Sequence, residues 1–340
     1  MANQQWNPST GIPNLKDKVA IVTGGSTGIG YETVKALAQG GAKVYMTTRN
    51  QTRARQAKEK ITEDPDIDPN NVQYLVMDLY DPTSITAAVD ELKNKENKVH
   101  ILINNAGAGT PSTELVDGKY EQHMAANHMG PFLLVNRLFP LLQAAASEKG
   151  ADVRIINIGS IAHIKMLPGH FEFKFDSPTC FKDPVPWYPW QWRFFGTFMF
   201  KFDMIRYAVS KAAVVLFTQE LQRRFDAQDL PIICIAVDPG TVRTEGLLAI
   251  SNIVVRTMAH LLFMTAEQGA ANSLFAATAR EVKEDAAKYQ GKFLVPVGKL
   301  EVPNPVAQDD RQVKGLWENT TVEVNKWLTE RKLPPLEADY

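Results

Sequence analysis

A glycine-rich turn that joins an apolar run to a helical pattern constrains the fold of this 340-residue chain more than any other feature. Residues 19–22 form a continuous apolar run, which is typical of a strand buried on both faces of a parallel sheet. Glycines follow at positions 24, 25, 28 and 30, and a helical apolar pattern then begins. A turn with so few side chains either only reverses the chain or lets a diphosphate approach the backbone and the amino end of the helix. Because this turn lies between a strand and a helix, we favour the second interpretation and predict a dinucleotide-binding unit.

Strand and helix patterns continue to alternate along the chain. Strand patterns cover residues 42–47, 72–77, 99–103 and 153–159, and helical patterns of ten or more residues separate them. Connections of this kind are right-handed and place the strands in one parallel sheet with helices on both faces. We therefore predict a single α/β domain over residues 1–340, whose doubly wound sheet has about seven strands within a core of residues 17–300.

The composition excludes several classes of protein. With 37 Lys and Arg against 38 Asp and Glu, the net charge of -1 creates no global field that would attract nucleic acid. The two cysteines, Cys180 and Cys234, cannot form a disulfide framework and fit a reducing compartment. Residues 1–14 are polar and hold two prolines, so they resemble neither a signal peptide nor an anchor. We expect a cytoplasmic protein with no nucleic-acid partner and no metal site.

The end of the second predicted strand holds the residues that distinguish between two related dinucleotides. An acidic residue there binds the hydroxyls of the adenosine ribose, whereas a basic residue accommodates a 2'-phosphate. The chain has Thr48-Arg49-Asn50 at this position and no acid. By charge pairing we predict NADP(H) rather than NAD(H), with Arg49 as the phosphate ligand. The alternative is that Arg49 only begins the solvated basic helix that holds Arg53, Arg55 and Lys58.

A tyrosine and a lysine lie four residues apart in the segment Tyr207-Ala208-Val209-Ser210-Lys211. In a helix this spacing places both side chains on one face, one turn apart. A phenol with an ordinary pKa of about 10 exchanges protons poorly at neutral pH unless a nearby cation favours the phenolate. We interpret Lys211 as that cation, although the same spacing also occurs in many helices without a function.

Taken in order, these motifs resemble those of the short-chain dehydrogenase/reductase family. Residues 23–30 carry its Thr-Gly-x-x-x-Gly-x-Gly turn, residues 104–107 its Asn-Asn-Ala-Gly segment and residues 238–244 its Pro-Gly-x-Val-x-Thr segment. Four single residues match the family's helix asparagine, catalytic serine, tyrosine and lysine, in this order: Asn127, Ser160, Tyr207 and Lys211.

A narrower resemblance is to the retinol-dehydrogenase and WW-domain-oxidoreductase-like members, through residues 48–50, 127–134 and 316–318. It implies a Rossmann-type fold and an NADP(H)-dependent oxidoreductase that interconverts a ketone or aldehyde and an alcohol. Two alternatives remain open. One is a non-catalytic relative that senses NADP(H) or acts as a scaffold, and the other is a dehydratase or isomerase that uses the same tyrosine.

The resemblance also implies a catalytic role for each of the four matched residues. Tyr207 would exchange a proton with the substrate oxygen, and Lys211 would lower the pKa of that tyrosine and bind the nicotinamide ribose. Ser160 would orient the substrate oxygen, and Asn127 would hold a water molecule that links Lys211 to solvent.

A larger set of residues is implied to bind the cofactor. Within it, Asp78 would contact the adenine, Asn105 the adenosine ribose and Thr244 the carboxamide. The complete set is Gly24, Ser26, Thr27, Gly28, Ile29, Gly30, Arg49, Asp78, Asn105, Ala106, Gly107, Tyr207, Lys211, Pro239, Gly240, Val242 and Thr244.

The main departure from the family is a long insert, residues 163–204, before the catalytic tyrosine. Residues 171–202 hold 13 of the chain's 31 aromatic residues, which argues against disorder. Three interpretations compete. The insert is a lid lined with aromatics over an apolar, polycyclic or lipid-like substrate, or a structural element packed on the core or on a second subunit, or a membrane-surface anchor. Tryptophans beside Arg193 and Lys201 suit the third interpretation.

The chain after residue 244 should complete the substrate site and the sheet. Residues 245–265 resemble the family's variable substrate lobe, with an ordinary core-facing helix as the alternative. Residues 291–295 have the pattern of the last strand, and residues 308–331 that of a final helix whose Trp317 and Trp327 would cover the sheet edge or a partner. We expect an apolar small-molecule substrate, and we leave a homodimer and a peripheral membrane contact open.

Overall fold

The strands of the protein form one sheet in the order β3-β2-β1-β4-β5-β6-β7-β8, in a computed structural model that describes residues 6–110, 112–185, 187, 189–200, 202–243, 248, 252–337 and 340. All neighbouring strands are parallel except β7 and β8, which form an antiparallel pair. The predicted doubly wound α/β fold is therefore confirmed, and the two-residue β8 is the strand beyond the predicted seven. The strands are β1 (Val19–Thr23), β2 (Lys43–Thr48), β3 (Val72–Val76), β4 (Ile101–Asn104), β5 (Val153–Ile158), β6 (Ile232–Val237), β7 (Phe293–Val295) and β8 (Lys299–Leu300).

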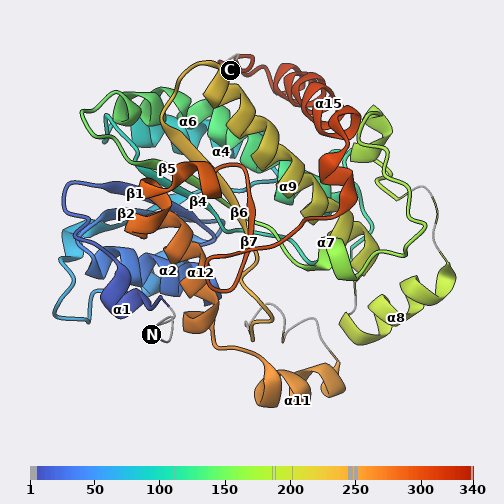
Figure 1. Cartoon of the computed structure of the whole chain (residues 1–340), viewed down its shortest axis with the longest axis horizontal. Helices are drawn as coiled ribbons and strands as arrows, with labels where there is room; N and C mark the ends of the chain where they lie inside the picture. The colour runs from blue at the N-terminus through green and yellow to red at the C-terminus, as the bar shows by residue number, and fades with distance from the viewer. Residues whose placement is uncertain are drawn as a thin grey trace.

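Helices cover both faces of the sheet, and buried apolar side chains form one cluster on each face (Figure 1). One face carries α2 (Gly28–Gln39), α3 (Gln51–Ile61) and α12 (Ala266–Thr278), and the other carries α4 (Pro82–Lys93), α6 (Gly130–Ala146) and α9 (Met204–Ala227). The other α-helices within the described residues are α1 (Pro8–Gly11), α5 (Gln122–Met124), α7 (Ala162–Lys165), α8 (Trp190–Phe200), α11 (Ile253–Leu262), α13 (Arg280–Glu284), α14 (Ala286–Tyr289) and α15 (Asp310–Glu330).

The strand order places a crevice at the carboxyl end of β1. This strand lies between β2 and β4, so the chain runs outward in opposite directions from it. The connections that leave β1 and β4 diverge to opposite faces, and ligands of such sheets bind in the opening between them. Every residue of β1, β4 and β5 is buried because helices cover both faces, which explains why most residues of these strands are apolar.

The C-terminal helix α15 packs along α9 and closes one side of the molecule (Figure 1). Trp317 is buried and its ring stacks on that of Phe217, with 6.0 Å between centroids. Trp327 is also buried, and its indole N–H donates to Asp117 Oδ2 at 2.8 Å. Both tryptophans therefore belong to the core rather than to a surface that a partner would cover.

The long insert divides into two parts with different surroundings. In the first part Phe175 and Phe181 are buried, and the N–H of Phe175 donates to Gln312 Oε1 of α15 at 2.8 Å. The second part contains α8, which lies at the outside of the molecule beside α11 (Figure 1). The first part of the insert is therefore packed on the core, whereas α8 in the second part contacts α9 on one side and is exposed on the other.

Candidate active site

The turn after β1 forms a cradle that has room for backbone contacts only. Gly24 has a φ of +65°, a conformation that favours glycine, and a Cβ on Gly30 would lie 2.3 Å from the Gly24 carbonyl oxygen. Helix α2 begins at Gly28, Thr27 makes no side-chain cap and the first turn holds no acid. The first N–H groups of α2 therefore point at the turn without a side-chain acceptor, which fits a bound pyrophosphate.

The end of β4 holds this turn in place. Asn105 Nδ2 donates to the Thr23 carbonyl oxygen at 2.8 Å, and the Ala106 N–H donates to Thr23 Oγ1 at 2.8 Å. The side-chain amide of Asn105 thus holds the glycine turn against the end of β4. The ribose contact that the family resemblance implies for Asn105 stays a prediction, and its side chain binds the backbone of the cradle.

The end of β2 presents the residues proposed to select the dinucleotide. Ser26 Oγ of the glycine turn donates to Thr48 Oγ1 at 3.3 Å, so the turn and the end of β2 are joined. Arg49 is exposed, and its guanidinium lies 5.7 Å from the ring centre of Tyr80. Asp78 follows β3, and its Oδ1 accepts the Tyr80 N–H at 3.0 Å. Arg49 and Asp78 therefore both lie against Tyr80, beyond the ends of β2 and β3.

The three residues of the predicted proton-transfer centre come together, although 51 positions separate the first from the last (211 minus 160). Ser160 follows β5, and its hydroxyl lies close enough to the phenol of Tyr207 to lower the pKa of that phenol. Lys211 lies one turn further along α9, with Nζ 5.6 Å from the centre of the Tyr207 ring. Nζ donates to the Ile158 carbonyl oxygen at 2.7 Å, so β5 anchors the lysine as well as the serine.

Burial dominates the electrostatics of this centre. Burial raises the pKa of Tyr207 to about 12, with a contribution from the Asp238 charge and against the opposing effect of the Ser160 hydroxyl. Burial also lowers the pKa of Lys211 to about 8, against the opposing attraction of Asp238. The sequence predicted that Lys211 would lower the pKa of Tyr207, whereas the net shift of the tyrosine is upward. Tyr207 is consequently a protonated donor at neutral pH.

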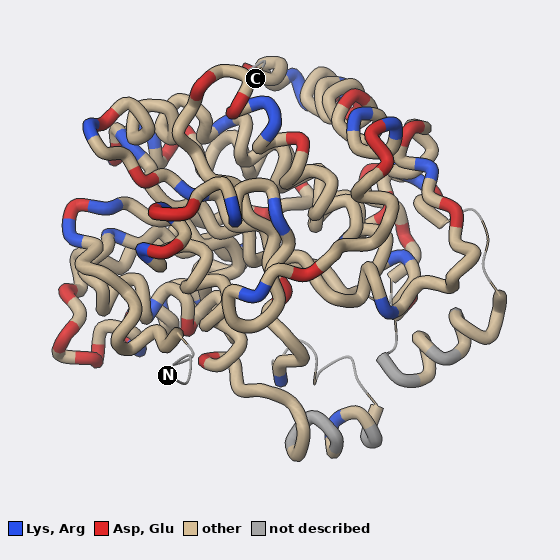
Figure 2. The backbone as a smooth tube through the Cα atoms, viewed as in Figure 1, with Lys and Arg blue, Asp and Glu red and all other residues tan. Residues whose placement is uncertain are grey.

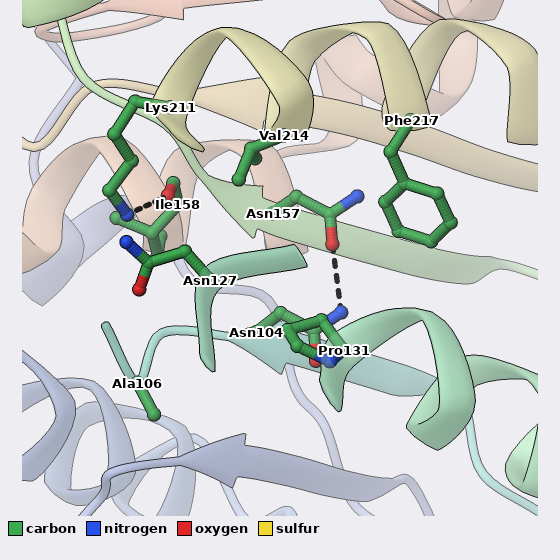
Figure 3. Close-up of a pocket in the computed structure, with 9 residues that line it drawn as sticks. All are labelled: Asn104, Ala106, Asn127, Pro131, Asn157, Ile158, Lys211, Val214 and Phe217. Carbon is green, nitrogen blue, oxygen red and sulfur yellow. Dashed lines mark hydrogen bonds between the residues drawn. The ribbon is translucent and has the colours of Figure 1, made fainter. Parts of the chain in front are cut away.

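Asn127 lies where a helix widens beneath Lys211. Residues Ala125–Met129 form a π-helical turn, a distortion that is frequent at functional sites. Asn127 Oδ1 accepts the Ala108 N–H at 2.7 Å, and its Nδ2 donates to Ser210 Oγ at 2.9 Å. Figure 3 shows Asn127 and Lys211 on one side of a small cavity of about 10 Å³, which has room for about one water molecule.

The Pro-Gly segment after β6 closes the crevice. Gly240 has a φ of +83°, and Val242 forms a bridge to Met264. A Cβ on Gly269 of α12 would lie 2.5 Å from Val242 and 3.3 Å from Ile29, so these side chains share one wall. Thr244, which the sequence also assigned to the cofactor, lies outside the described residues.

Two residues that hold the Ser160 turn were given no role by the sequence reasoning. Asp238 is buried, and its carboxylate accepts the N–H of Ile161 at 3.0 Å and that of Gly240 at 3.1 Å. The imidazole Nδ1 of the fully buried His163 hydrogen-bonds the Ser160 carbonyl oxygen. Asp238 stood in a recognisable motif, whereas nothing local distinguishes His163 from an ordinary core residue.

A buried Glu121–His123 pair also lies beside the tyrosine. Glu121 Oε1 is 2.6 Å from His123 Nδ1, and His123 Nε2 accepts the Thr110 N–H at 3.3 Å, which places the imidazole proton on Nδ1. Burial alone would raise the pKa of Glu121, but the hydrogen bond from His123 holds it below its ordinary value. The His123 ring lies 6.1 Å from that of Tyr207 and 6.1 Å from that of Phe202, so this pair supports the wall around the phenol.

Comparison with solved structures shows the same fold in other proteins. An uncharacterized protein from Mycobacterium Paratuberculosis superposes with a TM-score of 0.67 and 23% identity, covering 94% of this chain and 98% of that one. An NADPH-bound carbonyl reductase from chicken fatty liver superposes with a TM-score of 0.58 and 22% identity, covering 85% of this chain and all of that one.

Sequence relatives extend over most of the chain. A family model described as short chain dehydrogenase matches residues 18–171. The short chain dehydrogenase/reductase dpchH of Colletotrichum higginsianum is 37% identical over 321 residues, which are 94% of this chain and 77% of that protein. The polyprenol dehydrogenase of Homo sapiens is 34% identical over 276 residues, covering 80% of this chain and 76% of that protein. With the Ser160, Tyr207 and Lys211 side chains gathered at the crevice of a doubly wound sheet, the chain belongs to the short-chain dehydrogenase/reductase family of nicotinamide-dependent oxidoreductases.

Proposed function

We propose that the protein is an NADP(H)-dependent oxidoreductase that interconverts a ketone or aldehyde and an alcohol on an apolar small molecule. The observation that carries this proposal is the convergence of Ser160, Tyr207 and Lys211 at the open end of β5, next to the glycine cradle. The buried free cysteines support our assignment of the enzyme to a reducing, cytoplasmic compartment.

The chain's own residues supply binding, orientation and a proton. A bound reduced nicotinamide supplies the hydride. Tyr207, protonated because burial raises its pKa, donates its proton to the carbonyl oxygen as negative charge develops there. The Ser160 hydroxyl holds the same oxygen, and its own position is held by Asp238 and His163. Lys211 returns a proton to the phenol, and one water molecule in the cavity beside Asn127 is the intermediate carrier.

The preference for NADP(H) rests on charge at the end of β2. Arg49 is an exposed cation at the position where a 2'-phosphate is recognised, and residues 42–52 contain no acid. The carbonyl reductase structure, which is similar to this chain in fold, contains NADPH and supports the same preference.

The apolar substrate class rests on the surroundings of Tyr207. The Phe202 ring packs edge-on against the phenol with 5.6 Å between centroids, so a substrate that reaches Tyr207 passes an aromatic wall. The relative that is named polyprenol dehydrogenase supports a substrate of this kind.

The proposal is tested with NADPH carrying deuterium at the transferable position and a panel of apolar ketones and aldehydes. We expect loss of NADPH absorbance together with one deuterium in the alcohol product. A product without the label would identify a dehydratase or isomerase instead. Tight NADPH binding without turnover of any carbonyl compound, or of the corresponding alcohols with NADP⁺, would identify a sensor or scaffold.

We expect Arg49→Asp to lower kcat/KM for NADPH by about 10- to 100-fold and to raise kcat/KM for NADH, because it replaces an attractive charge with a repulsive one beside the 2'-phosphate. The measurement is the ratio of kcat/KM for the two cofactors with one substrate. Arg55→Asp is the matched control, since it makes the same charge change on exposed α3 where Arg55 pairs with Glu59. An unchanged ratio in Arg49→Asp, or an equal change in both variants, would contradict the assignment of Arg49.

A further inference from the structure

An exposed aromatic stripe runs along α8. Trp190, Phe194 and Phe198 recur every four residues, and their exposed fractions are 71%, 62% and 60%. Their rings follow one another at centroid distances of 6.4 and 6.0 Å. Gly196 lies on the opposite side of the helix, where a Cβ would meet Met204 at 3.2 Å. The helix therefore turns its glycine toward α9 and its rings toward solvent.

Helix α11 extends this apolar stripe. Asn252 Nδ2, just before α11, donates to the Phe198 carbonyl oxygen at 2.9 Å and joins the two helices. Leu261 and Leu262 are 78% and 72% exposed. Among the described residues, six of the eleven exposed large apolar side chains lie on these two helices and a seventh lies just before α8. Together they define the α8–α11 surface: Trp187, Trp190, Trp192, Phe194, Phe198, Leu261 and Leu262.

The charged residues within the two segments of the α8–α11 surface are basic. Residues 184–202 and 246–266 contain no Asp or Glu, but they include Arg193, Lys201 and Arg256. Figure 2 shows acidic and basic residues interspersed over the rest of the molecule and no acidic residue along α8 or α11. Within these two ranges, large apolar residues are thus combined with basic residues alone, and the acidic residues Asp183, Asp203, Glu245 and Glu267 stand at their ends.

We infer that the α8–α11 surface docks on an anionic lipid bilayer. Tryptophan and phenylalanine side chains flanked by cations enter the boundary between headgroups and acyl chains, and the cations attract anionic lipid. A second copy of this surface would bring the same positive charge into contact with itself, which disfavours a symmetric dimer here. The contact is peripheral, because no helix among the described residues has both the length and the apolar character needed to cross a bilayer.

The docked surface adjoins the path to Tyr207. The two segments that form it leave from the carboxyl ends of β5 and β6, which is the edge of the sheet that carries the active site. Phe202, two residues after α8, packs on Tyr207. An apolar substrate dissolved in the bilayer would therefore reach the phenol without crossing water. This delivery step rests on the proposed function, whereas the docking itself does not.

The experiment is co-sedimentation of the full chain with vesicles of phosphatidylcholine alone and of phosphatidylcholine mixed with phosphatidylserine. We expect binding to the mixed vesicles that weakens as salt is raised, and a loss of at least about tenfold in the triple variant Trp190→Ala, Phe194→Ala, Phe198→Ala. The matched control is Val302→Ser with Val322→Ser, which removes exposed apolar side chains elsewhere and should bind like wild type. Arg193→Gln with Lys201→Gln should reduce binding to the mixed vesicles only.

Three results would overturn the inference. They are no binding to either kind of vesicle, equal loss in the control variant, and a wild-type dimer in solution that the triple variant converts to monomer without any effect on vesicles. Turnover of a water-soluble ketone separates this inference from the proposed function. The triple variant should keep that turnover, with kcat/KM lowered only for substrate supplied in vesicles. A wild-type protein that binds vesicles but reduces no ketone would contradict the proposed function and leave the docking intact.

Discussion

Tyr207→Phe is expected to lower kcat by about two to four orders of magnitude while the dissociation constant for NADPH stays within about twofold. The phenol is the proton donor of the proposed reaction, and burial keeps it protonated at neutral pH by raising its pKa to about 12. Phenylalanine keeps the ring that packs on Phe202 and His123, so the variant removes one hydroxyl and little else. Single-turnover rates with saturating NADPH measure the effect on the chemical step directly.

A matched control separates loss of the donor from loss of a buried hydroxyl. Tyr45 is buried in the sheet, and its hydroxyl donates to Glu96 at 2.7 Å, far from the crevice. Tyr45→Phe should lower the unfolding free energy by about 1 kcal/mol and leave kcat unchanged. If Tyr207→Phe retained more than about a tenth of the wild-type kcat, Tyr207 would not be the proton donor.

Lys211→Met is expected to abolish activity and, at the same time, to stabilise the fold. The folded protein holds Lys211 with a pKa of about 8, against an ordinary value of 10.5. Keeping it charged below pH 8 therefore costs about 3 kcal/mol of unfolding free energy at 1.4 kcal/mol per pKa unit. Losing the hydrogen bond from Lys211 to Ile158 lowers the unfolding free energy by about 1 kcal/mol. We therefore expect the unfolding free energy of Lys211→Met to be about 2 kcal/mol higher than that of the wild type at pH 7. Denaturant unfolding of both proteins gives this difference.

The same shift predicts how stability depends on pH. Because the folded pKa of Lys211 lies below the unfolded one, the unfolded chain binds more protons between pH 8 and 10.5. The contribution of Lys211 to stability therefore rises with pH through this window, and the rise should be absent from Lys211→Met.

Arg154 provides the contrasting buried cation. It pairs with Asp152 at 2.7 Å and donates to the carbonyl oxygens of Ala276 and Ala279 at 3.0 Å each, so Arg154→Met should destabilise the fold by about 3 kcal/mol or more without acting on the chemistry. A fall in stability for Lys211→Met like that of Arg154→Met would show that Lys211 serves the fold rather than the reaction.

The cofactor cradle and the sheet could be predicted from local patterns. The strand at β1, the glycines of the turn and the start of α2 are adjacent in the chain, so their geometry follows from steric limits within about a dozen residues. The two-residue β8 escaped prediction because so short a strand has no pattern of its own. It exists only because its edge pairs with β7.

The supports of the active site could not be predicted in the same way. His163 reaches the Ser160 carbonyl, and Glu121 reaches His123, only because the fold buries these groups where no water competes for their hydrogen bonds. The upward shift of the Tyr207 pKa has the same origin, since burial is a property of everything that packs around the phenol.

By itself, the sequence determined the doubly wound fold, the family and the residues that meet at the crevice. Each of these follows from short motifs, and the order of those motifs along the chain sets the order of the strands. Only the tertiary structure decided which aromatic residues of the insert are buried and which are exposed. Phe175 and Phe181 are covered by α15, whereas Trp190, Phe194 and Phe198 on α8 have no such cover and face solvent. The physical reason is that an aromatic residue is equally apolar in either place, and whether it is buried depends on which distant segment packs against it.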